Sequence, residues 1–212
     1  MSAHLWTPLG SAQHPFMGVI MPEITEIRRT VIECSPEETE GSEDSTKDGE
    51  SGGGDAQVCY KYDTTFAAVT IKGIIVNEPN MSNVGFFGYT QGATIESLNI
   101  KYSLFHGQQY VGGISAVSDH DVIRRSSVTD DQGDDITMIT ANYCSGGMVG
   151  ESNGSVITGG QSEAKYMGSA IYNGGVAGKA TGGKITNTYV MARPRMSSLY
   201  TGGIVGLADG TD

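Results

Sequence analysis

The chain has 212 residues, including 31 glycines, and carries a formal net charge of -11. This length suits one substantial domain or a run of repeats that share an elongated core. The acidic balance argues against a nucleic-acid-binding protein, which would show a basic stripe, and against binding to an anionic membrane. No run of about 18 apolar residues predicts a membrane-spanning helix, and residues 1–20 lack the pattern of a signal peptide.

We expect the first 34 residues to form strands that lead into the main domain. Trp6-Thr7-Pro8-Leu9-Gly10 and Pro15-Phe16-Met17-Gly18 indicate turns or strand edges, because proline and glycine punctuate them closely. Residues 23–34 show apolar positions at helical spacing, but their β-branched content favours a strand.

The segment from residue 35 to residue 57 holds eight acidic residues, one lysine and a glycine run. So few apolar groups cannot offset the entropy of ordering, which predicts a mobile acidic insertion. Cys34 and Cys59 flank it. A disulfide between them is one reading, and two ordinary buried thiols are the other.

We place the main domain in residues 58–212, and a glycine-marked unit recurs through it from residue 83 onward. Its clearest copies are Ser145-Gly146-Gly147-Met148-Val149-Gly150, Asn173-Gly174-Gly175-Val176-Ala177-Gly178 and Thr201-Gly202-Gly203-Ile204-Val205-Gly206. With two degenerate copies included, the anchor glycines are Gly85, Gly113, Gly147, Gly175 and Gly203, at spacings of 28, 34, 28 and 28 residues. A fixed period in this range is typical of a solenoid.

The register of the repeat extends beyond its glycines. An isoleucine lies ten residues after each of the first four anchors, at Ile95, Ile123, Ile157 and Ile185. Apolar stretches of four to eight residues bounded by Gly, Asn and Ser indicate strands rather than helices. We therefore predict an all-β, glycine-rich β-solenoid with coils of about 28 residues, three short strands in each coil, and glycines at corners that need φ > 0 or close backbone approach. The handedness of the solenoid does not follow from the pattern.

One coil is six residues longer than the others, and its excess falls near residues 129–135. Asp130, Asp131, Asp134 and Asp135 surround Gly133 there. Clustered carboxylates on a glycine-bent loop supply the oxygen ligands that Ca²⁺ prefers, so a calcium site and a solvated acidic loop are the two readings. No other cofactor is indicated.

Tyr110, Tyr172 and Tyr200 each lie three residues before an anchor glycine, and Tyr143 is one residue out of that register. On a solenoid these side chains line one face. If exposed, they form an aromatic strip for sugar or protein partners; if buried, they form a stacking ladder.

Signatures of catalysis are weak. Asp119-His120-Asp121 falls at a repeat turn, where we expect solvated side chains rather than an acid–base or metal site. The sequence contains neither the H-E-x-x-H pattern of zinc peptidases nor a G-x-S-x-G nucleophile motif.

The units from residue 83 to residue 212 resemble GLUG repeats, named for a Gly-Leu-(any)-Gly core, here Gly147-Met148-Val149-Gly150 and its equivalents. Residues 6–10 and 16–18 resemble the W-x-P-I-G…F-x-G lead-in that often precedes such repeats. The resemblance implies a secreted or surface-attached bacterial protein, often adhesin-like. Some GLUG proteins are metallopeptidases that cleave immunoglobulin A, but their zinc motif does not occur in this sequence.

These observations favour a non-enzymatic structural or adhesive module, extracellular or on the cell surface, with a host or matrix protein or a glycan as partner. The chain stops a few residues into a fifth repeat, so we expect it to be part of a longer polypeptide. The alternatives are an accessory region of a larger secreted peptidase and a β-helical polysaccharide-active enzyme.

Overall fold

The computed structural model describes residues 4–20, 24–33, 58–66, 68–130, 137–166, 170–191 and 198–212. The chain divides into two units. One combines Met1–Pro22 with Ala68–Asp212, and the other spans Glu23–Ala67. Among the described residues, no helix is long and apolar enough to cross a membrane.

The smaller unit is a two-stranded antiparallel hairpin of β3 (Ile24–Glu33) and β4 (Val58–Phe66). The strand predicted from the β-branched residues after position 23 is therefore present. It pairs antiparallel with β4. The acidic segment and Cys34 lie outside the described residues, so neither the expected mobility nor a Cys34–Cys59 pair is tested.

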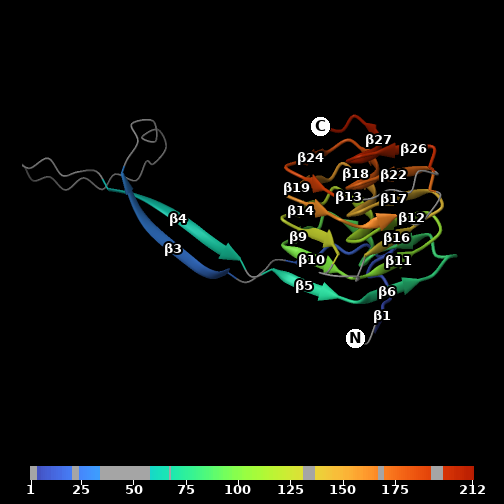
Figure 1. Ribbon diagram of the computed structural model, residues 1–212, viewed down its shortest axis with the longest axis horizontal. Coiled ribbons are helices and arrows are strands. Elements are labelled where there is room, and N and C mark those ends of the chain that lie inside the picture. Colours follow the sequence, from blue (N-terminus) through green and yellow to red (C-terminus); the bar gives the residue numbers. More distant parts are fainter. Residues whose placement is uncertain are drawn as a thin grey trace, which may run out of the picture. The chain divides into compact units, whose positions relative to one another are not determined.

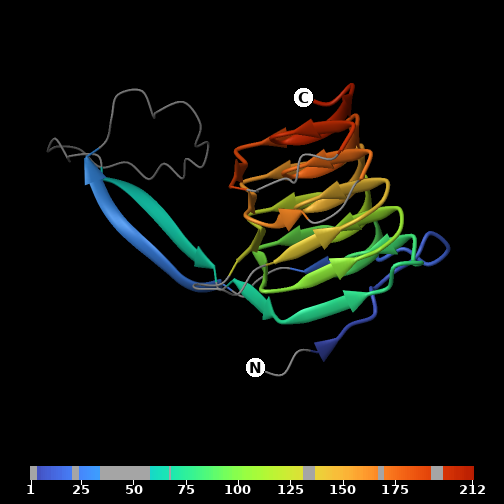
Figure 2. The ribbon, with the colours of Figure 1, turned by 45° about the vertical axis from the view of Figure 1, so that its right-hand side comes forward.

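The larger unit is a parallel β-solenoid in which the described strands form five sheets of five strands (Figures 1 and 2). From β5 (Val69–Lys72) to β24 (Lys184–Thr186) the chain visits sheets 1 to 5 in turn, once in each of four coils. Sheet 1 contains β5 (Val69–Lys72), β10 (Leu98–Lys101), β15 (Ser127–Thr129), β20 (Gln161–Ser162) and β25 (Tyr189–Val190). Sheet 2 contains β1 (His4–Leu5), β6 (Ile74–Asn77), β11 (Leu104–His106), β16 (Met138–Thr140) and β21 (Lys165–Tyr166).

The remaining three sheets follow in the same way. Sheet 3 contains β7 (Asn83–Val84), β12 (Tyr110–Gly112), β17 (Cys144–Gly146), β22 (Tyr172–Gly174) and β26 (Tyr200–Gly202). Sheet 4 contains β8 (Phe87–Gln91), β13 (Ser115–Asp119), β18 (Val149–Asn153), β23 (Ala177–Thr181) and β27 (Val205–Asp209). Sheet 5 contains β2 (Val19–Ile20), β9 (Thr94–Glu96), β14 (Val122–Arg124), β19 (Val156–Thr158) and β24 (Lys184–Thr186).

The solenoid and its period of about 28 residues are confirmed, but a coil contains five short strands rather than the three that we predicted. The strands are two to five residues long, as in β20 and β13. A turn of one or two residues separates many of them, so several corners fall inside stretches that look continuous in sequence.

The core is built from rows of equivalent residues, one from each coil. The predicted isoleucine row is present: Ile95, Ile123, Ile157 and Ile185 pair in register along sheet 5. The first three are fully buried. Each coil alone would bury little apolar surface, so stacking on its neighbours completes the core.

The anchor glycines serve close approach between coils rather than a left-handed backbone. A Cβ on Gly113 would lie 2.6 Å from Val128 Cγ1 and 2.8 Å from the carbonyl oxygen of Gly147 in the next coil. Left-handed backbone instead occurs seven residues after each anchor, as at Gly154 (φ 64°). In one coil His120 takes that position, with φ 53°.

Residues 4–20 cover the N-terminal end of the solenoid. Trp6 stacks on Phe86 with ring centroids 4.8 Å apart, and Phe16 packs on Phe87 at 4.6 Å. Leu9 and Phe16 form parallel bridges to sheet 4, and β2 extends sheet 5. The lead-in segment therefore adds to sheets 2, 4 and 5 at this end.

In the coil that is six residues longer than the others, the strands on both sides of the extra residues keep their register with the neighbouring coils. Strand β15 pairs with β10 and β20, and β16 pairs with β11 and β21. The extra residues lie between β15 and β16, where the sequence had located them. In the chain they connect β15 of sheet 1 to β16 of sheet 2.

Candidate binding surface: the tyrosine row

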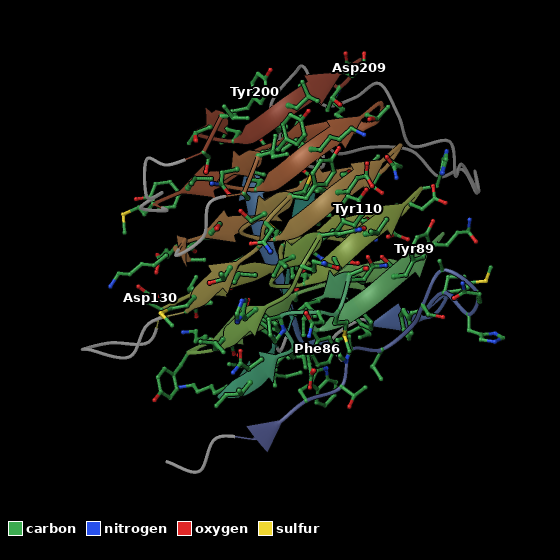
Figure 3. All side chains as sticks on the ribbon, turned by 90° about the vertical axis from the view of Figure 1, so that its right-hand side faces the viewer. Phe86, Tyr89, Tyr110, Asp130, Tyr200 and Asp209 are labelled. Carbon is green, nitrogen blue, oxygen red and sulfur yellow. The ribbon has the colours of Figure 1, made fainter. Side chains whose placement is uncertain are left out.

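Four tyrosines follow one another along the solenoid at the start of sheet 3, and we call Tyr110, Tyr143, Tyr172 and Tyr200 the tyrosine row. Figure 3 labels its two outer members, Tyr110 and Tyr200. Neighbouring ring centroids are 5.7, 5.5 and 5.2 Å apart. The first two contacts are edge-to-face, and the last is stacked. The row is therefore continuous across four coils.

The row is neither buried nor fully exposed. Tyr110, Tyr143 and Tyr172 are half-buried, and Tyr200 is 52% exposed. The arrangement thus combines the two readings of the sequence: the rings stabilise one another, and part of each ring still faces solvent.

Tyr143 occupies the row although its backbone is out of register. The residue aligned with Tyr110 and Tyr172 is Cys144, whose side chain is fully buried. The Tyr143 ring comes from the preceding turn and fills the gap that the smaller thiol leaves. Its offset in sequence had set it apart from the other three.

Amide side chains lie beside the first two rings. A cleft of about 420 Å³ is lined by Gln108, Gln109, Tyr110, Asn142 and Tyr143. Tyr110 begins β12, and the other four residues come from the turns that precede β12 and β17. The backbone holds the turns together, because Asn142 N donates to Gln108 O at 3.0 Å and Cys144 N donates to Gln109 O at 2.7 Å. The cleft therefore offers aromatic faces and neutral hydrogen-bonding groups.

An ion pair lies on sheet 4 near the row. Lys179 Nζ is 2.9 Å from Glu151 Oε1, and this hydrogen bond raises the pKa of Lys179. Burial and the Glu151 carboxylate raise the pKa of Tyr110, so its hydroxyl remains protonated at neutral pH. Burial also raises the pKa of Cys144 to about 12, which makes a thiolate nucleophile there unfavourable.

The proposed calcium site lies largely outside the described residues. Of its four aspartates the structure describes Asp130, whose Oδ1 accepts a hydrogen bond from Thr137 N at 2.6 Å. Asp131, Asp134 and Asp135 are not among the described residues. No group of three or more potential metal-ligating side chains occurs in the described part of the chain. The calcium site stays a prediction, and a Ca²⁺-dependent rise in the thermal midpoint would test it.

The structure corrects the expectation of a fully solvated Asp119-His120-Asp121 turn. His120 is exposed and its Nδ1 lies 2.6 Å from Asp119 Oδ1. Asp121 is instead 1% exposed. Its carboxylate accepts hydrogen bonds from Ser118 Oγ at 2.6 Å, from Ala93 N at 2.7 Å and from Thr90 Oγ1. These contacts give Asp121 a structural role between sheets 4 and 5.

A second, polar groove of about 490 Å³ lies on sheet 1 and was not found from the sequence. Residues of sheet 1 and adjoining turns in three successive coils line it: Asn99, Lys101, Arg125, Ser126, Ser127, Thr129, Asp130, Gly159, Gln161 and Glu163. Several of its groups bond to one another, as when Ser127 Oγ donates to Asn99 Oδ1 at 2.7 Å. Thr129 Oγ1 is buried without a hydrogen-bond partner. The repeat pattern gave no signal for this groove, because its residues differ from coil to coil.

Comparisons with protein-family models, curated proteins and solved structures gave no match for this chain. The arrangement of its strands nevertheless identifies it as a β-solenoid repeat protein.

Proposed function

We propose that this chain is a non-enzymatic adhesive repeat module of a bacterial cell-surface or secreted protein, and that its tyrosine row binds carbohydrate. The observation that carries the proposal is the run of partly exposed rings from Tyr110 to Tyr200, with Gln108, Gln109 and Asn142 beside it. The chemistry of this surface supports a carbohydrate ligand.

The side chains in the cleft suit a neutral sugar. The C–H face of a pyranose packs on an aromatic ring, and tyrosine joins such an apolar face to a polar hydroxyl. The amides of Gln108, Gln109 and Asn142 each offer donors and acceptors for sugar hydroxyl groups. A few polar groups that fix orientation beside apolar contact surface are typical of small-ligand sites.

The solenoid gives the row its length. Parallel strands repeat every 4.7–4.9 Å or so, and the ring centroids are 5.2 to 5.7 Å apart. A row that crosses four coils therefore suits an extended chain molecule better than a single small ligand. The resemblance of residues 83–212 to GLUG repeats supports the extracellular or surface location and the adhesive role.

A glycan array probed with the whole chain tests the proposal. We expect binding to a limited set of neutral oligosaccharides. For those ligands Tyr110→Ala and Tyr143→Ala should each weaken affinity about tenfold, which corresponds to about 1.4 kcal/mol. Tyr110→Phe should retain most of the affinity, because it keeps the ring.

Tyr189→Ala is the matched control, since Tyr189 is 55% exposed but lies on sheet 1, away from the row. It should leave affinity unchanged. Absence of glycan binding by the wild-type chain, or full affinity in both alanine variants, would contradict the sugar-binding role. The repeats would then act as a structural stalk alone.

A further inference from the structure

The polar groove on sheet 1, which we call the sheet 1 groove, is large enough to hold a small ligand. Its volume of about 490 Å³ lies within the range of typical small-ligand sites. Side chains from β10, β15 and β20 line it together with residues of adjoining turns. Three coils therefore have to stack before the groove exists.

The hydroxyl group of Thr129 lines this groove and has no hydrogen-bond partner. Val128 is fully buried in the core, and side chains alternate along a strand, so its neighbour Thr129 points to the outer face of sheet 1. Thr129 is nevertheless only 6% exposed, and its Oγ1 makes no hydrogen bond. The other such atom in the described part of the chain is Ser162 Oγ, but Ser162 pairs with Val128 on the core side. A buried hydroxyl without a partner costs free energy that a ligand atom can recover.

The ammonium group of Lys101 lies next to this hydroxyl. Lys101 and Thr129 are partners in the parallel pairing of β10 and β15, so their side chains share one face on strands about 4.8 Å apart. No ion pair joins Lys101 to another residue in the described part of the chain. The other cation of the groove, Arg125, already pairs with the buried carboxylate of Glu96. Lys101 Nζ and Thr129 Oγ1 are thus two adjacent donors, which together suit a carboxylate.

Two half-buried carboxylates, those of Asp130 and Glu163, also line the groove. Glu163 belongs to the next coil, and its backbone N donates to Val128 O at 2.9 Å, which places Glu163 beside Thr129 on the side away from Lys101. Each carboxylate accepts one hydrogen bond at 2.6 Å within the chain. The second oxygen of each makes no hydrogen bond among the described residues. This side of the groove therefore suits a cationic donor such as an ammonium group.

The spacing of the two charged sides indicates the length of the ligand. Lys101 and Glu163 stand on either side of Thr129, two strand spacings or about 9–10 Å apart. An extended chain spans about 3.3–3.6 Å per residue, so the two ends of a tripeptide match this separation.

We propose that the sheet 1 groove binds a short zwitterionic peptide. The peptide carboxylate accepts hydrogen bonds from Lys101 Nζ and Thr129 Oγ1. The peptide ammonium group donates to the carboxylates of Asp130 and Glu163. The side-chain amide of Asn99, which also lines the groove, provides donors for the peptide carbonyl groups between them.

The sheet 1 groove and the tyrosine row are formed by different sheets. Figure 3 shows Asp130 of the groove well separated from Tyr110 of the row. Peptide binding in the groove and sugar binding at the row are therefore separate functions, and failure of one leaves the other intact.

Isothermal titration calorimetry of the whole chain with triglycine tests the proposal. We expect one triglycine molecule to bind per chain. N-acetyltriglycine lacks the ammonium group and triglycine amide lacks the carboxylate, so each should bind at least about tenfold more weakly. The comparison separates recognition of both charged ends from a general affinity for peptide groups.

Thr129→Val tests the unpaired hydroxyl with a side chain of nearly the same shape. The variant should bind triglycine about tenfold more weakly, because the hydrogen bond to the carboxylate is lost. Without ligand it should have a higher thermal midpoint than wild type, because it no longer buries a hydroxyl without a partner. Weaker binding together with higher stability cannot result from misfolding.

Lys101→Met should also weaken triglycine binding about tenfold, because the charge that faces the carboxylate is removed. Two matched controls lie outside the groove: Thr70→Val on β5 of the same sheet and Lys184→Met on β24 of sheet 5, both at exposed positions. Both should keep wild-type affinity. Absence of triglycine binding by the wild-type chain would overturn the proposal. Equal binding of the two blocked peptides, or full affinity in both Thr129→Val and Lys101→Met, would do the same.

Discussion

The ring of Tyr143 stands edge-on to the ring of Tyr172, with centroids 5.5 Å apart and planes at 87°, although the two backbones are one residue out of register. The ladder is thus maintained by the positions of the rings rather than by equivalent backbone positions. A turn residue can supply the ring when the strand residue in register, here Cys144, carries a small buried side chain instead of a ring. The aromatic row can therefore stay continuous even where the strand position itself carries no tyrosine.

Replacing Tyr143 tests how much the ladder contributes to stability. Tyr143 makes edge-to-face contacts with both Tyr110 and Tyr172, and each such pair contributes about 0.5–1.5 kcal/mol beyond area burial. We expect Tyr143→Ala to lower the free energy of unfolding by about 1–3 kcal/mol, measured by urea denaturation. Tyr143→Phe keeps both ring contacts and should have little effect. Equal losses in the two variants would show that the hydroxyl, and not ring packing, matters.

The isoleucine row should be the most sensitive part of the core. Ile123 is fully buried between Ile95 and Ile157. Ile123→Ala should therefore destabilise the solenoid by about 2–5 kcal/mol through lost burial and the cavity that remains. Val156, next to Ile157 on β19, is partly exposed. Val156→Ala should therefore lower the free energy of unfolding by less than about 1 kcal/mol. Chemical denaturation of the two variants compares them directly.

Asp121 should make stability depend on pH in the opposite sense to an ordinary paired carboxylate. Burial raises the pKa of Asp121 in the folded chain above its usual value. Folding therefore favours the protonated acid, and this contribution is largest below the unfolded pKa and is lost as pH rises through the folded pKa. In Asp121→Asn the side-chain amide can accept a hydrogen bond from Ala93 N and donate hydrogen bonds to the hydroxyls of Thr90 and Ser118. The variant should gain stability relative to wild type as pH rises from about 4 to about 8.

Asp119 provides the contrasting measurement. Its burial opposes ionisation, but hydrogen bonds with His120 and Gln91 outweigh that effect and lower the pKa of Asp119. Asp119 therefore contributes stability above its unfolded pKa, and this is lost as pH falls through the folded pKa. Asp119→Asn should be less stable than wild type at neutral pH, and the difference in stability should shrink at low pH. If Asp121→Asn also lost stability relative to wild type as pH rises, our explanation of both carboxylates would be contradicted.

Cys144 should be unreactive while the chain is folded. Its side chain is fully buried, and burial raises its pKa to about 12. Because the thiolate is the reactive form, alkylation by iodoacetamide at neutral pH should be at least about a hundredfold slower than in the unfolded chain. Mass spectrometry of the Cys144 peptide separates this thiol from the other two cysteines. Rapid labelling under native conditions would show that the coil opens there.

Much of the fold was accessible from the sequence because a stacked core forces equivalent residues to recur. The isoleucines at 95, 123, 157 and 185 revealed the period of the repeat. The six extra residues near residue 130 showed which coil is longer and where its added length lies. The five-strand coil was not predicted, because strands as short as β20 contain too few residues for an alternating pattern. The row of left-handed positions carries a signal that was overlooked: glycine occurs seven residues after four of the five anchors, and His120 occupies the fifth.

The surface was less predictable than the core. Three tyrosines of the row follow the repeat, but Tyr143 joins them through a side-chain direction that register does not fix. The burial of Asp121 depends on Thr90 and Ser118 converging on it from strands of neighbouring coils. The sheet 1 groove likewise combines side chains that differ in each coil. Such features depend on contacts between residues about 28 positions apart, which local sequence patterns do not specify.

The corner between Thr129 and Met138 has a consequence for how this kind of protein diversifies. The strands on either side keep their neighbours, although this coil is six residues longer than the others. Length at this corner is therefore uncoupled from the spacing of the core rows. Peptides inserted between these two strands should therefore leave the core rows and the strand pairing unchanged, which makes this connection suitable for grafting new recognition loops.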